Sequence, residues 1–189
     1  YATSSDTLPA TKNLTINSGA VLLISTTTDS LDLAVSGDIT INGEFRMNSS
    51  SDHIMVCGNW NKATTGTVTT SGLVTFSGSD NTKTINNGSS SFYDVEISGT
   101  TTFQINSSTT IRNNLTITSG IFEVSNNNLS IGGNFINNGA FNSGTGATTV
   151  TFTASSGTKN ISLGSSTFDV LVFDDGVPAV SSAVYQLSS

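Results

Sequence analysis

The sequence is poor in cysteine, proline and charge, and each shortage excludes a class of structure or partner. Cys57 is the only cysteine, so no internal disulfide framework can form. Proline occurs twice, and 10% of the 189 residues are charged. The net charge is −7, and the six lysines and arginines are scattered singly. Because they form no basic patch to neutralise phosphates, we expect no nucleic-acid partner.

Long apolar runs and helical periodicity are also missing. No run approaches the ~20 apolar residues that span a bilayer, so we expect no transmembrane segment. No window places apolar side chains at the 3.6-residue period of a helix. The chain begins at Tyr1 without a methionine. That start fits a mature form after signal-peptide removal, and it also fits a trimmed chain.

Small polar residues dominate the amino-acid composition. Serine, threonine, asparagine and glycine make up 99 of the 189 residues. Between them, β-branched and aromatic residues recur in short, evenly spaced clusters, which a disordered chain would not show. A surface of serine, threonine and asparagine with little charge is typical of secreted material. We therefore expect an extracellular, cell-surface protein with an all-β fold.

Short strands can be read from the alternation of side chains. In the segment NLTI, Leu14 and Ile16 point to one side, while Asn13 and Thr15 point to the other. Similar triplets begin at Ile39, Leu115 and Leu129. The inward residues would stack on their equivalents about 4.8 Å away. The outward asparagine and threonine rows would add hydrogen bonds between strands.

The spacing of these clusters predicts a parallel β-solenoid with coils of about 20 residues. One apolar anchor per cluster gives nine anchors, which we read as nine coils. The alternative is an antiparallel β-sandwich of the pilin type, completed by a donated strand. In the solenoid, six of the anchors (Leu14, Ile39, Trp60, Val95, Leu115 and Phe135) should face inward. The full set is Leu14, Ile39, Trp60, Phe76, Val95, Leu115, Phe135, Phe152 and Leu171.

A tandem duplication lies inside the repeat. Segment 38–99 maps onto 114–175 at an offset of about 76, which aligns Val74 with Val150. We divide the chain into a polar N-terminal segment, 1–12, a repeat domain, 13–176, and a C-terminal strand, 177–189. Neither end resembles a polar cap. We therefore expect self-association through the ends, with the C-terminal strand a candidate for pairing between subunits.

The repeat style resembles that of a known group of proteins. The strings VTFSGSDNTKTINN, NLTITSG, GNFINNGAF and VTFTASSGTKNI resemble repeats in bacterial and archaeal cell-surface β-solenoid proteins. These include adhesin-like and haemagglutinin-like proteins and extracellular filament or sheath proteins. The resemblance covers about residues 13–175. It implies a structural or adhesive role and supplies no catalytic residues.

Candidate chemistry is sparse, and we expect no catalytic, cofactor or metal site. His53 is the only histidine. Asp174 and Asp175 follow a strand and read as a turn. Asp29 and Asp32 flank another turn and lack the partners of a calcium loop. A polysaccharide-active β-helix enzyme is a remote alternative, because such enzymes use clustered carboxylates.

Four other residues are candidates for a covalent link or a contact at the surface. Cys57 is either an inert, half-buried thiol or the site of an intermolecular disulfide. Trp60 aligns with Phe135 in the duplication, which favours a core position over a sugar-stacking platform. Tyr93 and Tyr185 are the better candidates for surface contact.

Seven sequons for N-linked glycosylation occur, about as many as the composition predicts by chance. Strand alternation places the asparagines of NLT and NLS on the outer face, so Asn13, Asn114 and Asn128 could carry glycans without disturbing the core. The full set is Asn13, Asn48, Asn87, Asn106, Asn114, Asn128 and Asn160.

These features favour a self-assembling structural subunit of a cell-surface filament, pilus, sheath or surface layer. The expected partner is the protein itself, and no cofactor is expected. The alternative is an adhesin domain that binds carbohydrate or another cell surface.

Overall fold

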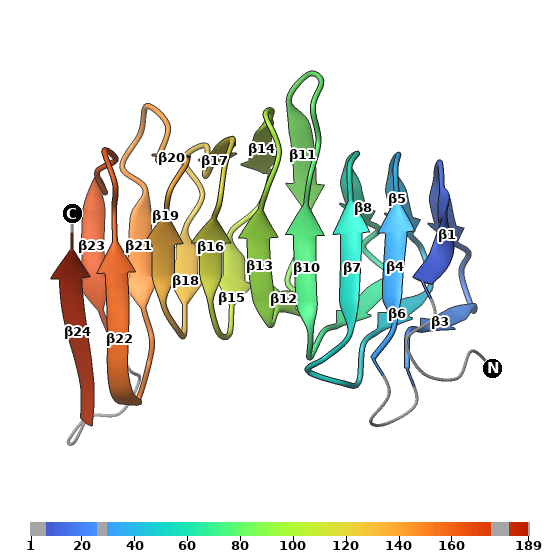
Figure 1. Cartoon of the computed structure of the whole chain (residues 1–189), viewed down its shortest axis with the longest axis horizontal. Coiled ribbons are helices and arrows are strands. Elements are labelled where there is room, and N and C mark those ends of the chain that lie inside the picture. The colour runs from blue at the N-terminus through green and yellow to red at the C-terminus, as the bar shows by residue number, and fades with distance from the viewer. Residues whose placement is uncertain (1–6, 26–29, 175–181, 189) are drawn as a thin grey trace.

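The computed structural model describes residues 7–25, 30–174 and 182–188, and all their regular structure is β-strand. The described residues form twenty-four short strands that wind around one axis, and each complete coil places one strand on each of three walls (Figure 1). Every strand pairing is parallel, and Asp32 lies opposite His53, so a coil takes about 21 residues. The β-solenoid is therefore confirmed, and the β-sandwich alternative is wrong. No helix in the described ranges is long and apolar enough to cross a membrane.

Wall 1 is a nine-stranded sheet, seen face-on in Figure 1. Its strands are β1 (Thr7–Thr11), β4 (Asp32–Val35), β7 (His53–Val56), β10 (Leu73–Phe76), β13 (Asp94–Ile97), β16 (Leu115–Ile117), β19 (Phe135–Asn137), β22 (Ser156–Ser162) and β24 (Ser182–Ser188).

Wall 2 is a seven-stranded sheet. Its strands are β2 (Leu14–Ile16), β5 (Ile39–Ile41), β8 (Trp60–Lys62), β11 (Lys83–Asn86), β14 (Thr102–Ile105), β17 (Ile121–Glu123) and β20 (Ala140–Asn142).

Wall 3 consists of a three-stranded and a five-stranded sheet, which touch through β9 and β12. Its strands are β3 (Val21–Leu23), β6 (Glu44–Arg46), β9 (Thr67–Thr69), β12 (Ser91–Phe92), β15 (Thr109–Ile111), β18 (Leu129–Ile131), β21 (Thr149–Phe152) and β23 (Val170–Phe173).

The stack contains seven complete coils, not the nine predicted. An incomplete eighth coil contributes β22 and β23, and β24 follows. Counting anchors overestimated the number of coils because the anchors lie on different walls. Phe135 in β19 and Phe152 in β21 belong to the same coil, so that coil was counted twice.

The duplication shifts the chain by one wall. Its offset carries β8 onto β19 and β10 onto β21, which is eleven strands, one short of four coils. Val74 therefore lies on wall 1 and its equivalent Val150 on wall 3. The two copies of the repeated sequence therefore pack in the same way but lie on different walls.

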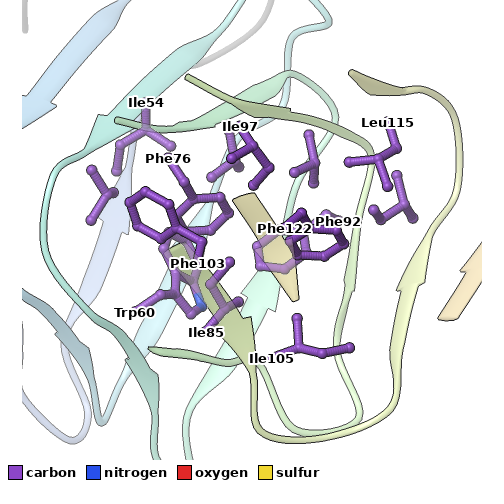
Figure 2. Packing of buried hydrophobic residues seen from close by; sticks show 14 of the residues in the cluster. Ile54, Trp60, Phe76, Ile85, Phe92, Ile97, Phe103, Ile105, Leu115 and Phe122 are labelled. Carbon is purple, nitrogen blue, oxygen red and sulfur yellow. The ribbon is translucent and has the colours of Figure 1, made fainter. Parts of the chain in front are cut away.

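Aromatic side chains show that the packing is repeated. Trp60 lies 6.0 Å from Phe76 and 5.4 Å from Phe92 between ring centroids, in T-shaped contacts (Figure 2). In the second copy, the equivalent Phe135 lies 6.4 Å from Phe152 and 5.4 Å from Phe168. Such edge-to-face pairs are worth about 0.5–1.5 kcal/mol beyond their burial.

The predicted inward residues lie in the core. Five of them (Ile39, Trp60, Val95, Leu115 and Phe135) are fully or almost fully buried, and Leu14 in the first coil is half-buried. The Trp60 indole also donates a hydrogen bond from Nε1 to Oδ1 of the buried Asn87, at 3.1 Å. A buried indole cannot stack on a sugar, so that alternative for Trp60 is excluded.

Glycines line the corner that follows wall 1, where successive coils approach closely. A Cβ atom on Gly58 would lie 2.4 Å from the carbonyl oxygen of Gly37, and one on Gly99 would lie 2.4 Å from that of Gly78. Gly99 also has φ +142°, a conformation that side chains disfavour. At this corner the absence of a side chain therefore allows the coils to stack this tightly.

The described parts of both terminal segments form strands. Within the segment expected to be polar, 1–12, residues Thr7–Thr11 form β1, which pairs with β4. The C-terminal strand β24 has a partner within its own chain, because it pairs with β22 along its whole length. It therefore extends wall 1, and an exchange between subunits is not needed to pair its inner edge.

Candidate functional site

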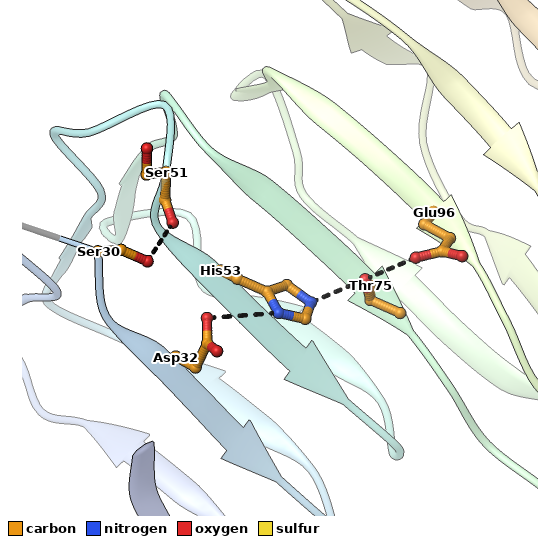
Figure 3. A network of polar contacts seen from close by, with 6 residues as sticks. All are labelled: Ser30, Asp32, Ser51, His53, Thr75 and Glu96. Atoms are coloured by element: carbon orange, nitrogen blue, oxygen red, sulfur yellow. Dashed lines mark hydrogen bonds and ion pairs between the residues drawn. The ribbon is translucent and has the colours of Figure 1, made fainter. Parts of the chain in front are cut away.

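A row of polar side chains crosses the outer face of wall 1. His53 Nε2 lies 2.9 Å from Thr75 Oγ1, and its Nδ1 lies 3.6 Å from Asp32 Oδ1 (Figure 3). Thr75 Oγ1 donates to Glu96 Oε2 at 3.2 Å, and Thr118 Oγ1 donates to Glu96 Oε1 at 2.6 Å. From Asp32 to Thr118 the row links five consecutive coils from the outside, and its members are about one coil apart in sequence.

Each ring nitrogen of His53 can donate or accept according to the tautomer, so the direction of its bond to Thr75 follows from the bond between Thr75 and Glu96. A hydroxyl has one proton, and Thr75 donates it to Glu96, so His53 Nε2 must be the donor to Thr75. His53 is therefore not placed as a base toward this hydroxyl. Thr75 is also 5% exposed, which closes it to a substrate. The row contains residue types found in catalytic triads, and its contacts join each coil to the next.

A shallow hollow of about 270 Å³ lies beside this row on wall 1. Its polar groups are largely engaged with one another. Asp94 Oδ1 accepts hydrogen bonds from Asn113 Nδ2 at 2.9 Å and from the Asn114 backbone N–H at 2.8 Å. The lining residues are Leu73, Asp94, Val95, Glu96, Asn114 and Thr116.

Asparagine and aspartate ladders run along the corners, as the predicted outward rows suggested. Asn114 Oδ1 accepts from both the backbone N–H and the Nδ2 group of Asn134, each at 2.9 Å. Asn134 Oδ1 accepts in turn from the Asn160 backbone N–H at 2.8 Å. On wall 2, Asn13 Oδ1 likewise accepts from the Asp38 backbone N–H at 2.9 Å. Each carbonyl thus satisfies a backbone donor one coil further on.

Six of the seven sequon asparagines lie at or near the surface. Asn114 is half-buried, and five others are exposed. A glycan is attached through Nδ2, so the ladder bonds made by Oδ1 of Asn13 and Asn114 are compatible with modification. The exposed five are Asn13, Asn48, Asn106, Asn128 and Asn160.

Asn87 does not fit the predicted set. It is 0% exposed, and its Oδ1 accepts from Trp60 Nε1 while its Nδ2 donates to the Ser90 carbonyl at 3.0 Å. Both ends of the carboxamide are therefore used inside the rod. A glycan at Asn87 is incompatible with this fold.

Cys57 follows β7 and is half-buried. Burial raises the pKa of its thiol. A higher pKa leaves less thiolate at neutral pH, and thiolate is the reactive form. The structure thus favours the inert thiol over the intermolecular disulfide.

The two tyrosines are less available than predicted. Tyr93 is half-buried, and the Arg112 guanidinium lies 5.4 Å from its ring centroid. Tyr185 packs its ring 4.6 Å from that of Phe173, and its hydroxyl accepts from the Ala154 backbone N–H at 3.0 Å. One ring therefore lies beside a cation, and the other belongs to the end of the core.

The acidic residues form no metal centre in the described part of the chain. Asp32 has a 55% exposed side chain, and Asp174 is exposed beyond β23. Asp29 and Asp175 lie outside the described residues. Throughout those residues, no group of three or more histidine, cysteine, aspartate or glutamate side chains is placed to hold a metal.

Asp52 is a buried carboxylate that the sequence did not single out. It is 1% exposed, and its Oδ2 accepts from Ser25 Oγ at 2.8 Å and from the backbone N–H of Ser49 at 3.0 Å. The Asn48 backbone N–H donates to the same oxygen at 3.1 Å. These bonds fix the turn that precedes β7, so the role of Asp52 is structural.

Comparisons with protein-family models, curated proteins and solved structures found no match to this chain.

Proposed function

We propose that this chain is an extracellular structural protein, a self-assembling subunit of a cell-surface filament, pilus, sheath or surface layer. One observation carries the proposal: in the last described strands, β23 and β24, two apolar side chains that continue the core columns are exposed. There, Leu187 is 61% exposed and Phe173 is 47% exposed. Exposed apolar surface of this kind marks a contact region in soluble proteins.

The walls support a structural role. Their outward polar groups are used to join one coil to the next, as in the row from Asp32 to Glu96 and in the asparagine ladders. The charge content of 10% also keeps repulsion between copies low. The resemblance of the repeats to those of cell-surface solenoid proteins points to the same role and to an extracellular location.

Sedimentation over a concentration series, combined with negative-stain microscopy, tests self-assembly. We expect ordered assemblies for the unchanged chain and weaker association for Leu187→Asp, which places a charge on the uncovered core. Gln186→Asp is the matched control, because it adds the same charge on the outer face of the same strand. A chain that stays monomeric at every concentration would overturn the proposal. Deleting 177–189 is a poorer test, because it also strips β22 of its partner.

The second candidate is an adhesin domain that binds carbohydrate, and the hollow on wall 1 favours it. An apolar residue, Leu73, lies there beside Glu96 and Asn114, a mixture that suits a sugar ring. Binding to a glycan array should then be lost in Thr116→Arg, which fills the hollow. It should persist in Thr110→Arg on wall 3. Equal binding by both variants would exclude this site.

A further inference from the structure

The turns from wall 2 to wall 3 differ in length between neighbouring coils. The first coil crosses this corner with four residues, 17–20, and the third coil again uses four, 63–66. The second coil, between them, crosses it with Asn42 and Gly43 alone. A short turn between two longer ones leaves a notch in the side of the rod, and the described coils flank this notch on both sides.

The short turn forms the floor of the notch, which has a volume of about 230 Å³. The backbone N–H groups of Asn42 and Gly43 both donate to the Ile16 carbonyl, at 2.8 and 3.1 Å, and hold the turn against the first coil. A Cβ atom on Gly43 would lie 2.3 Å from the carbonyl oxygen of Ala20, so a larger residue does not fit there. The depth of the notch is therefore set by backbone packing.

Polar side chains that line the notch are not used to join coils. Glu44, on β6, accepts from Arg46 through Oε1, from Nε at 3.0 Å and from a terminal guanidinium nitrogen. Among the described residues, nothing donates a hydrogen bond to Glu44 Oε2, and the side chains of Asn42 and Thr67 make none. Outward groups of the polar row and the asparagine ladders, by contrast, bond to the next coil. The notch thus offers polar groups that a ligand can use.

The pairing of Glu44 with Arg46 sets the charge that the notch presents. Glu44 is the only charged residue that lines it. Arg46 balances this charge, and its two contacts with one oxygen hold the carboxylate in place. A carboxylate held in this way is a strong acceptor that needs little further ordering on binding. Because the pair has no net charge, the notch suits a neutral ligand with hydroxyl donors better than a cation.

Apolar groups complete the lining. Ala20 and Val21 lie on the side formed by the first coil, and Val21 is 58% exposed. An apolar patch beside carboxylate, amide and hydroxyl groups matches a sugar ring, which has C–H groups on its faces and hydroxyls around its edge. The volume lies below the range of about 300–1,000 Å³ for drug-sized ligands, so one ring fits and a longer chain does not.

We propose that the notch binds a single neutral sugar ring at the end of a glycan. Ring hydroxyls donate to Glu44 Oε2 and accept from Asn42 Nδ2, and a C–H face packs against Val21. The inference rests on the carbohydrate-binding role given above as the second candidate function, but it places that role at a different site. In the hollow on wall 1, Asp94 is already bonded to the backbone of Asn114, whereas the groups of the notch are unengaged.

Binding to a printed array of neutral, amine-bearing and sulfated glycans tests this site. We expect the unchanged chain to bind neutral glycans and Thr67→Trp, which fills the notch, to lose that binding. Thr110→Trp is the matched control, because it makes the same change at an exposed position of wall 3 away from the notch, and it should bind normally. Glu44→Gln keeps the shape of the notch and should weaken binding about tenfold, because hydrogen bonds to a charged acceptor are the stronger ones.

Other outcomes separate this site from the proposed functions. Equal binding by Thr67→Trp and Thr110→Trp would overturn the notch, and if Thr116→Arg then lost binding, the hollow on wall 1 would be the carbohydrate site. Selective binding of amine-bearing or sulfated glycans would overturn the neutral ligand. Failure to bind any glycan would overturn both this site and the adhesin candidate, while sedimentation tests self-assembly separately. Far-UV circular dichroism checks each fold, and Glu44→Gln decides the matter if Thr67→Trp does not fold.

Discussion

Replacing Phe135 by aspartate should unfold the C-terminal half of the rod. Phe135 is 0% exposed and lies on β19, in the seventh coil. Its ring centroid lies 5.6 Å from that of Phe141, 6.4 Å from Phe152 and 5.4 Å from Phe168. With Phe135 on wall 1, Phe141 on wall 2 and Phe152 on wall 3, the rings of all three walls meet here, and the substitution removes one of them.

The magnitude follows from two costs. Loss of a buried phenylalanine side chain costs about 3–5 kcal/mol. The carboxylate adds the cost of an unpaired buried polar group, which raises the total above about 5 kcal/mol. Domains of this size are stable by about 5–15 kcal/mol. The loss is therefore a large fraction of the stability, and in a stack it falls first on the neighbouring coils.

Urea denaturation followed by two probes measures this effect. Trp60 emission reports on the third coil, and far-UV circular dichroism reports on the whole rod. We expect Phe135→Asp to lose part of its circular dichroism signal at low urea, before Trp60 becomes exposed. Ile136→Asp is the matched control, because Ile136 points outward on the same strand and the change should cost about 1 kcal/mol. Equal midpoints for Phe135→Asp and the unchanged chain would refute the core column.

Three further predictions concern single sites. Asn87→Ala should cost about 1–3 kcal/mol, because it leaves the Trp60 indole N–H without its acceptor; Asn86→Ala is the control, and equal urea midpoints would contradict this. Cys57 should react with iodoacetamide at neutral pH more slowly in the folded than in the unfolded chain, because its thiol pKa is raised; equal rates would show an accessible thiolate. Glycopeptide analysis of native material should find heterogeneous glycans on exposed sequons and none on Asn87, whose occupancy would contradict its burial.

Most of the fold could be predicted from local alternation. Leu115 and Ile117 alternate with outward residues, and their neighbours recur at nearly constant spacing, which is the condition for stacking coils. The coil count could not be predicted in the same way. Any wall can supply the largest apolar residue of a coil. The anchor of the third coil, Trp60, lies on wall 2, whereas that of the fourth coil, Phe76, lies on wall 1.

The outer polar row was missed although a signal was present. Asp32, His53, Thr75 and Glu96 recur at intervals of about one coil, but none is near another in sequence. A search for adjacent carboxylates could not find them. Their contacts depend on the pairing register, which places Asp32 opposite His53.

The burial of Asn87 could have been deduced from alternation alone. Ile85 points inward, so the residue two positions later, Asn87, points inward as well. A sequon pattern contains no information about which face of a strand carries the asparagine. The exposure of Leu187 is a different case, because it depends on its place in β24, the last described strand of wall 1, and not on any local pattern.

The eleven-strand offset of the duplication has a consequence for how such rods change. Asn59 Oδ1 accepts from the Thr84 backbone N–H at 2.8 Å at the entry to wall 2, and the equivalent Asn134 and Asn160 form the same bond at the entry to wall 1. A strand with its turn is therefore an interchangeable unit that fits any of the three walls. Inserting one such unit would move every later outward residue onto the next wall, while the apolar core remained continuous. The direction in which a surface group points can thus change without any change in the group itself.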